Sequence, residues 1–202
     1  MSFYRILQKI ALVLLRIYFK FEVIGANKID SSKFGAVLIS NHISNFDPIA
    51  LGLFLKKRKL YFMAKKELFS VPVLRFIIKK LGAFAVDRDK KDSGAIDMAV
   101  ELIKQDKIVA MFPQGHRSKK IDSLVPKTGF IRIAIKAKAK IIVSSIRYSG
   151  FWPRSKVYIK YEEIINYEDL IEKTKEQDET YFKTIRMLTL TVWQKVIESY
   201  SK

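Results

Sequence analysis

A histidine and an aspartate stand five positions apart in the stretch ISNHISNFDP, residues 39–48. The chain has only two histidines, and His42 follows the apolar run 35–38, where a buried strand is expected to end. A loop at the end of such a strand holds side chains rigidly while leaving them accessible. A free imidazole titrates near pH 6.5 and can accept a hydroxyl proton, and a carboxylate such as Asp47 can fix its tautomer. The pair alone is a weak signal, because acidic residues are common enough to occur at this spacing by chance.

The elements that must position this pair alternate between strands and helices along the chain. This pattern predicts one α/β domain with a mixed, mostly parallel sheet flanked by helices. Ligands of such sheets collect at the carboxyl ends of the strands. Strands are expected at residues 22–25, 36–39, 59–64, 83–86, 108–112, 141–146 and 157–161. Helices are expected at residues 48–54, 92–105, 129–139 and 181–200, and on either side of Pro72 within 65–81.

Two further strand-end loops carry arginines. The loop 82–88 ends on Asp87 and Arg88, and the loop 112–118 contains Arg117. A guanidinium can grip a phosphate through two parallel hydrogen bonds, although a lone arginine is more often a surface residue. The chain has no cysteine and no G-x-S-x-G turn, which excludes thiol chemistry and argues against a covalent acyl-enzyme.

The net charge of +18 indicates a phosphate-bearing partner. Residues 1–80 hold 15 Lys/Arg against 4 Asp/Glu and residues 81–150 hold 14 against 7, whereas residues 151–202 balance at 9 against 9. A non-catalytic basic module for nucleic acid or anionic lipid is therefore an alternative to an enzyme. Nucleic acid is disfavoured because the cations of 65–81 alternate with bulky apolar residues and no nucleic-acid-binding motif is found.

The N-terminal segment 1–20 is expected to form an amphipathic helix, followed by the main domain 21–202. Lys9 and Arg16 leave only residues 10–15 uninterrupted, too few to span a bilayer. At helical spacing, Arg5, Lys9, Arg16 and Lys20 fall in a stripe about 60° wide with apolar side chains around it. Such a helix is typical of the membrane interface, with a core helix bearing one solvated edge as the alternative. A secretory signal is disfavoured because no small-residue cleavage site follows.

Three motifs occur in order along the chain: N-H-x-x-x-x-D at 41–47, G-x-x-x-V-D-R at 82–88 and F-P-x-G-x-R-S at 112–118. Together they resemble the lysophosphatidic acid acyltransferase family, the 1-acylglycerol-3-phosphate O-acyltransferases. The resemblance covers roughly residues 22–147. It implies the glycerol-3-phosphate acyltransferase-like fold and transfer of an acyl group from acyl-ACP or acyl-CoA to a lysophospholipid hydroxyl, giving phosphatidic acid from 1-acylglycerol-3-phosphate. It also implies a peripheral or monotopic location on the cytoplasmic face of an anionic membrane, with no metal and no cofactor beyond the thioester co-substrate.

The same resemblance assigns roles to individual residues. His42 is expected to act as general base and Asp47 as its partner. The residues expected to bind the substrate are Arg88, Arg117, Lys65 (with Lys66 as an alternative), Gly115 and Gln114. The family usually has Glu and Thr where this chain has Gln114 and His116, and a proline in the strand that here reads KIIVSSI, residues 140–146. These departures leave open another lysolipid acceptor, a lipid-binding relative without turnover, and His116 as a second base.

Overall fold

Strand β2 (Ala36–Ile39) lies inside the sheet, and all four of its side chains are buried. Val37 and Ile39 belong to the hydrophobic core on one face, and Ala36 and Leu38 to the core on the other. Successive strand side chains point to opposite faces, so a strand covered on both sides must be apolar throughout. The run AVLI fits that place.

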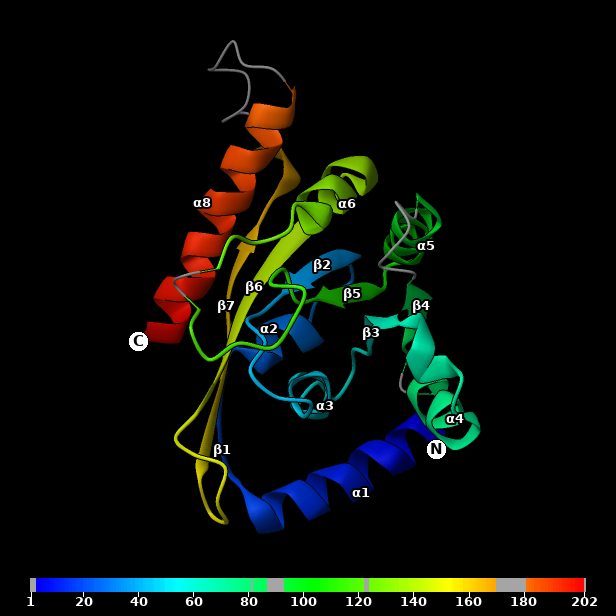
Figure 1. Ribbon diagram of the computed structural model, residues 1–202, viewed down its shortest axis with the longest axis vertical. Coiled ribbons are helices and arrows are strands. Elements are labelled where there is room, and N and C mark those ends of the chain that lie inside the picture. The colour runs from blue at the N-terminus through cyan, green and yellow to red at the C-terminus, as the bar shows by residue number, and fades with distance from the viewer. Residues whose placement is uncertain (1–2, 81, 87–92, 122–123, 170–180, 202) are drawn as a thin grey trace.

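The structure, a computed structural model, describes residues 3–80, 82–86, 93–121, 124–169 and 181–201. These residues form a seven-stranded sheet in the order β1-β7-β6-β2-β5-β3-β4 (Figure 1). The other strands are β1 (Lys20–Ile24), β3 (Leu60–Lys65), β4 (Phe84–Val86), β5 (Ile108–Met111), β6 (Lys140–Tyr148) and β7 (Lys156–Ile165). Neighbouring strands are parallel except β6 and β7, which are antiparallel. The predicted α/β class with a mixed, mostly parallel sheet is confirmed.

Helices cover both faces of the sheet. One core is formed with α5 (Ser93–Lys104), α6 (Gly129–Ala137) and α8 (Tyr181–Ser201). The other is formed with α2 (Ala26–Asp30) and α3 (Asp47–Leu53), and α1 (Phe3–Tyr18) joins it through Leu15. A short 3₁₀ helix (Lys66–Phe69) and α4 (Pro72–Lys80) lie beside β4 at the sheet edge. Figure 1 shows α1 at the end of the molecule away from α5, α6 and the start of α8.

The structure differs from the sequence-based expectation in the segment after residue 65, in α2 and in strands β6 and β7. The segment expected to be helical from residue 65 begins with the last residue of β3 and a 3₁₀ helix, and α4 starts only at Pro72. Helix α2 was not expected. Strands β6 and β7 are longer than predicted because they pair with each other along nearly their whole length, up to Tyr148 opposite Val157. That pairing involves distant segments, which local propensity does not report.

The N-terminal helix α1 forms where an amphipathic helix was expected. Its apolar side chains at Val13, Leu14 and Ile17 are 60–68% exposed, and Leu15 is among the few that pack inward. This exposure does not fit the alternative of a core helix with one solvated edge. No helix in the described part of the chain is both long and apolar enough to span a bilayer.

Candidate functional site

The loop after β2 is anchored to β6 by a side chain. Asn41 donates from Nδ2 to the carbonyl oxygen of Ile146 and accepts at Oδ1 from the Ile146 N–H, both at 2.8 Å. The Asn41 amide thus pairs with the backbone N–H and C=O of Ile146, as a residue of a neighbouring strand would. The next residue, His42, is held at the carboxyl end of the central parallel strands, where sheets of this class bind ligands.

His42 and Asp47 are hydrogen-bonded. His42 Nδ1 lies 2.8 Å from Asp47 Oδ2, with 18% of the histidine side chain exposed and none of the aspartate. Two backbone N–H groups, of Ile43 and Ser44, donate to the same Oδ2 at 2.6 and 2.8 Å. These donors satisfy the lone pairs of a buried oxygen that cannot reach water. A carboxylate on Nδ1 leaves Nε2 of the neutral imidazole as the nitrogen that can accept a proton.

The second carboxylate oxygen of Asp47 is held by Tyr148, whose hydroxyl donates to Oδ1 at 2.7 Å. Burial raises the pKa of Tyr148 above its usual value, and the adjacent charge of Asp47 raises it further, so the phenol stays protonated. Tyr148 was not among the predicted site residues because the strand was expected to end at Ile146. Tyr148 lies 101 positions after Asp47, so no local pattern joins them.

The loop 112–118 covers the other side of His42. The ring of Phe112 stacks on the imidazole with centroids 4.1 Å apart and 14° between the planes. The side-chain oxygen of Gln114 accepts a hydrogen bond from the His42 backbone N–H, and Ser118 N–H donates to the His42 carbonyl at 2.8 Å. The backbone and the ring of His42 are therefore both held by this loop.

Gln114 is buried, and its Nε2 has no hydrogen-bond partner among the described residues. This side chain positions the backbone of His42; contact with a substrate remains a prediction for it. Gly115 has φ +74°, a conformation that L side chains rarely adopt, and a Cβ there would lie 2.7 Å from Lys127 Cε. The left-handed backbone conformation therefore favours glycine at this position.

Of the cations expected to bind the substrate, Arg117 and Lys65 lie in described segments and Arg88 does not. Arg117 is exposed and makes no ion pair with any described residue, although the neighbouring Ser118 is tied to His42. His116 is also exposed, without an acidic partner in the described ranges. Lys65 is the last residue of β3. Arg88 lies outside the described residues, so its predicted role stays a prediction.

The hydrogen-bonded pair of His42 and Asp47 is suited to proton transfer. Among the described residues no group of three or more histidine or acidic side chains could hold a metal ion. A cavity of about 490 Å³ lies at the β4 edge of the sheet, between α4, β4 and α5. It is lined in part by Phe69, Phe84 and Met98 and does not include His42 or Asp47. The site therefore consists of the partly exposed imidazole of His42, oriented by the fully buried carboxylate of Asp47, and of the adjacent loop that carries the exposed Arg117.

The part of the chain that carries His42, Asp47 and the loop 112–118 is similar to known proteins. The Acyltransferase family model matches residues 20–148. The 1-acyl-sn-glycerol-3-phosphate acyltransferase of Bacillus subtilis (strain 168) is 34% identical over 116 residues, 57% of this chain and 56% of that protein. The 1-acyl-sn-glycerol-3-phosphate acyltransferase of Streptococcus pneumoniae (strain ATCC BAA-255 / R6) is 28% identical over 167 residues, 80% of this chain. The match spans 62% of the streptococcal protein. This chain therefore covers less than two thirds of the length of either relative.

A solved structure has the same fold. The crystal structure of the 1-acyl-sn-glycerophosphate (LPA) acyltransferase, PlsC, from Thermotoga maritima superimposes with a TM-score of 0.66. The match covers 95% of this chain and 76% of that chain, at 22% sequence identity. At this identity the likeness concerns the arrangement of helices and strands.

Proposed function

We propose that this chain, which belongs to the Acyltransferase family, moves a fatty acyl group from an acyl thioester to the free hydroxyl of a lysophospholipid. The acceptor that its relatives' names support is 1-acylglycerol-3-phosphate, and the product is then phosphatidic acid. The observation that carries the proposal is the imidazole of His42, bonded to buried Asp47 and partly open to solvent at the carboxyl end of β2.

In the proposed reaction His42 acts as the general base. Nε2 takes the proton of the acceptor hydroxyl while the hydroxyl oxygen attacks the thioester carbonyl carbon. The tetrahedral intermediate then breaks its carbon–sulfur bond, and the departing thiolate takes the proton from the imidazolium. Asp47 stabilises the imidazolium between the two steps and keeps the proton of the neutral ring on Nδ1. No covalent acyl-enzyme and no metal take part.

The acceptor phosphate is proposed to bind at the loop 112–118. Arg117 is exposed one residue before Ser118, whose N–H donates to the His42 carbonyl, so the arginine and the base belong to one connected loop. An arginine that makes no ion pair with any residue the structure describes is available for a bidentate contact with phosphate. Arg88 and Lys65 are proposed to assist. The donor, acyl-ACP or acyl-CoA, binds as a co-substrate.

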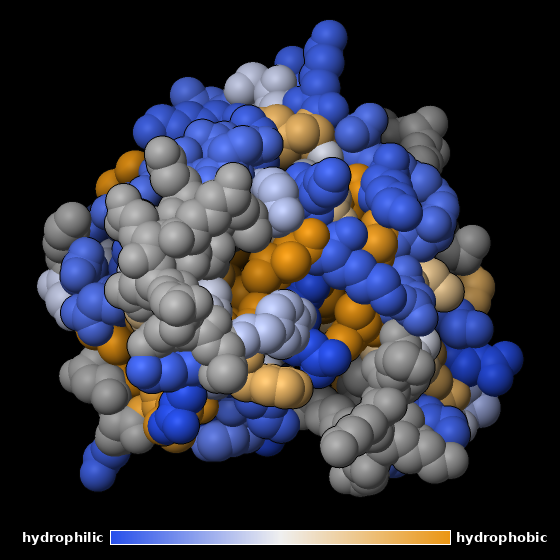
Figure 2. Space-filling model, turned by 90° about the horizontal axis from the view of Figure 1, so that it is seen from above, coloured by the Kyte–Doolittle hydropathy of each residue, from blue (hydrophilic) through white to orange (hydrophobic). Residues whose placement is uncertain are grey.

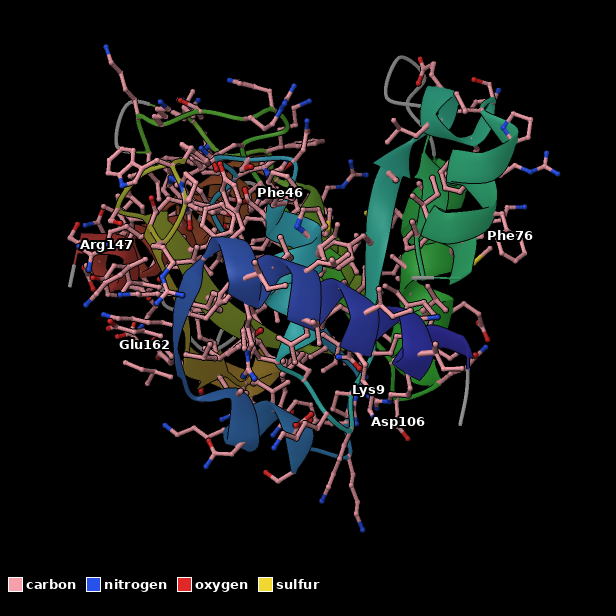
Figure 3. The ribbon with its side chains drawn as sticks, turned by 90° about the horizontal axis from the view of Figure 1, so that it is seen from below. Lys9, Phe46, Phe76, Asp106, Arg147 and Glu162 are labelled. Carbon is pink, nitrogen blue, oxygen red and sulfur yellow. The ribbon has the colours of Figure 1, made fainter. Side chains whose placement is uncertain are left out.

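The protein is proposed to bind peripherally to the cytoplasmic face of an anionic membrane, with α1 in contact with the lipid. Figure 3 shows the protein from below, with α1 lying across this side of the molecule and with Lys9 and Phe46 labelled. Figure 2 shows the opposite face, seen from above, where a hydrophobic area lies among hydrophilic residues. Exposed apolar side chains and cations on one helix suit the interface between acyl chains and headgroups.

The direct test is product identification. The purified protein is incubated with 1-acylglycerol-3-phosphate and either acyl-ACP or acyl-CoA, and products are identified by mass spectrometry. Phosphatidic acid from one donor is expected in wild-type protein and not in His42→Ala. A panel of other lysolipids tests the second candidate acceptor class, which Gln114 and His116 motivate. Absence of product from every acceptor, by a protein that binds anionic vesicles, would support a lipid-binding relative without turnover.

A further inference from the structure

The hydroxyl of Tyr148 completes the hydrogen bonding of the buried Asp47 carboxylate. Oδ2 takes the His42 ring and the N–H groups of Ile43 and Ser44, and Tyr148 is the donor to Oδ1 among the described residues. A carboxylate oxygen that is fully buried needs a donor, because it cannot reach water. Tyr148 therefore decides how the charge of Asp47 is shared between its two oxygens.

The ring of Tyr148 is itself held in place. It belongs to the last residue of β6, paired with Val157 of β7. Phe19, at the end of α1, meets it edge to face with centroids 6.0 Å apart, and Phe151 stacks on it at 4.9 Å. A hydroxyl on a ring fixed from two sides is aimed at Asp47 without further loss of freedom.

The charged surroundings of Tyr148 are simple. From α3 and its preceding loop it faces Asp47 and the hydroxyl of Ser44. From α1 and the β6–β7 turn it meets the uncharged rings of Phe19 and Phe151. Beyond these rings, the Lys119 ammonium lies over Phe151, 5.6 Å from its ring centroid. Asp47 is both the acceptor of the Tyr148 hydroxyl and the charge that adds to burial in raising the pKa of Tyr148.

We propose that Tyr148 is a positioning residue of the reaction: its hydroxyl fixes the Asp47 carboxylate and limits the pull of that carboxylate on the His42 imidazole. The inference rests on the proposed function, in which His42 is the base. A hydrogen bond to Oδ1 draws negative charge away from Oδ2. Without it Oδ2 carries more charge, stabilises the imidazolium more strongly and leaves less neutral base at a given pH. The carboxyl group also loses one of the contacts that prevent it from rotating.

The test substitutes Tyr148→Phe, which keeps the ring and removes the hydroxyl. We expect kcat to fall about tenfold, as for the loss of a hydrogen bond to a charged group. The acid limb of the kcat/KM pH profile should move upward by roughly 0.5 to 1 pH unit, while KM for the acceptor stays within about twofold. In an Asp47→Asn background the same substitution should have almost no further effect, because both act through one contact.

Tyr161→Phe is the matched control. Its hydroxyl donates to the carbonyl of Leu51, so this variant also loses a buried tyrosine hydrogen bond, but one that does not reach the Asp47 carboxylate. It should lower the melting temperature and leave the pH profile unchanged. Tyr148→Met, which also removes the hydroxyl, repeats the test if Tyr148→Phe does not fold.

A measurement without turnover separates this inference from the proposed function. The chain has two histidines, so NMR with labelled histidine gives two imidazole titrations, and His116→Gln assigns them. In Tyr148→Phe the His42 midpoint should rise while that of exposed His116 stays constant. An unchanged His42 midpoint and pH profile in folded Tyr148→Phe would overturn the inference, even if wild-type protein is an active acyltransferase. An upward shift in a protein inactive toward all lysolipids would retain the Tyr148–Asp47–His42 relation and reject the function.

Discussion

The imidazole of His42 lies nearly parallel to the ring of Phe112, with centroids 4.1 Å apart. Phe112 in turn stacks on Phe62 of β3 at 6.0 Å and 16°. The imidazole is therefore held from one face by rings that continue into the sheet and at Nδ1 by Asp47. A general base must be aimed at the proton it removes, and both contacts restrict the direction in which Nε2 points.

Phe112→Leu should lower kcat about tenfold with little change in KM, because a shift of about 1 Å in a reacting group can cost up to about a hundredfold. Steady-state kinetics with a melting curve tests this expectation. Phe34→Leu is the control, since Phe34 is also partly buried against the same core. Among the described residues, its ring neither stacks on His42 nor hydrogen-bonds to Asp47. Equal kcat values for wild type and Phe112→Leu would mean that stacking does not orient the base.

His42→Ala should reduce turnover by about 10²- to 10⁴-fold while the protein remains folded. Asp47→Asn should cost less in turnover, yet lower the melting temperature more, because the buried amide places N–H groups where backbone and side-chain donors now converge. His116→Ala, which removes the exposed histidine, is the control and should retain wild-type turnover. Near-normal turnover in folded His42→Ala would exclude its role as the base.

Arg117→Ala should raise KM for a phosphate-bearing acceptor about ten- to a hundredfold, corresponding to about 1.5–3 kcal/mol for a charge-assisted contact. KM for the acyl donor should change far less, and Arg117→Lys should restore only part of the loss because lysine lacks the bidentate geometry. Lys120→Ala removes another exposed cation from the same loop region as a control. Equal losses for donor and acceptor would show that Arg117 does not bind the acceptor phosphate.

Lys9→Gln with Lys20→Gln should weaken binding to anionic vesicles by about 1 kcal/mol per cation, with little effect on neutral vesicles. Arg5 and Arg16, the other two cations of the stripe, are left unchanged because both make contacts inside the protein. Arg5 donates to Leu55 O at 3.2 Å, and Arg16 lies over the Phe54 ring. Lys104→Gln with Arg132→Gln removes two exposed cations from α5 and α6 at the other end of the molecule as a control (Figure 1).

Tryptophan fluorescence offers a readout for this binding. Trp152 is 64% exposed in the β6–β7 turn, where Arg154 N–H donates to Tyr18 O at the end of α1, whereas Trp193 is 2% exposed. A blue shift on adding anionic vesicles should be lost in Trp152→Phe and reduced in the lysine variant. Vesicle flotation at low salt that is equal for wild type and the lysine pair would contradict the role of these cations.

Gln114→Glu should keep the hydrogen bond to the His42 backbone N–H while adding a buried negative charge beside it. The charge stabilises the imidazolium, so the acid limb of the pH profile should move to higher pH. Activity of Gln114→Glu/His116→Thr on 1-acylglycerol-3-phosphate should stay within about tenfold of wild type, or roughly 1.4 kcal/mol. The two single variants separate the buried position from the exposed one. If the double variant instead gained an activity that wild type lacks, Gln114 or His116 would select a different natural acceptor.

The sequence predicted the elements with a strong local signal. The run AVLI is apolar throughout and is followed by polar residues, so a strand buried on both faces and a functional loop were both expected. His42 and Asp47 are five residues apart, and a single turn of chain entering α3 suffices to bring Nδ1 and Oδ2 to 2.8 Å. Local pattern was misleading at 65–71, where residues with helical spacing end a strand and form a 3₁₀ helix.

The sequence by itself determined the α/β class, the chain order of the strands, the positions of the loops 41–47 and 112–118 after strands, and the amphipathic N-terminal segment, because each depends on residues within one element or loop. Tertiary structure decided which distant residues complete the site. Phe112 reaches His42 because β5 pairs with β2, and Tyr148 reaches Asp47 because β6 lies on the other side of β2 and extends to the β6–β7 turn. Sheet pairing joins segments about 70 to 105 residues apart, and only the assembled sheet specifies it.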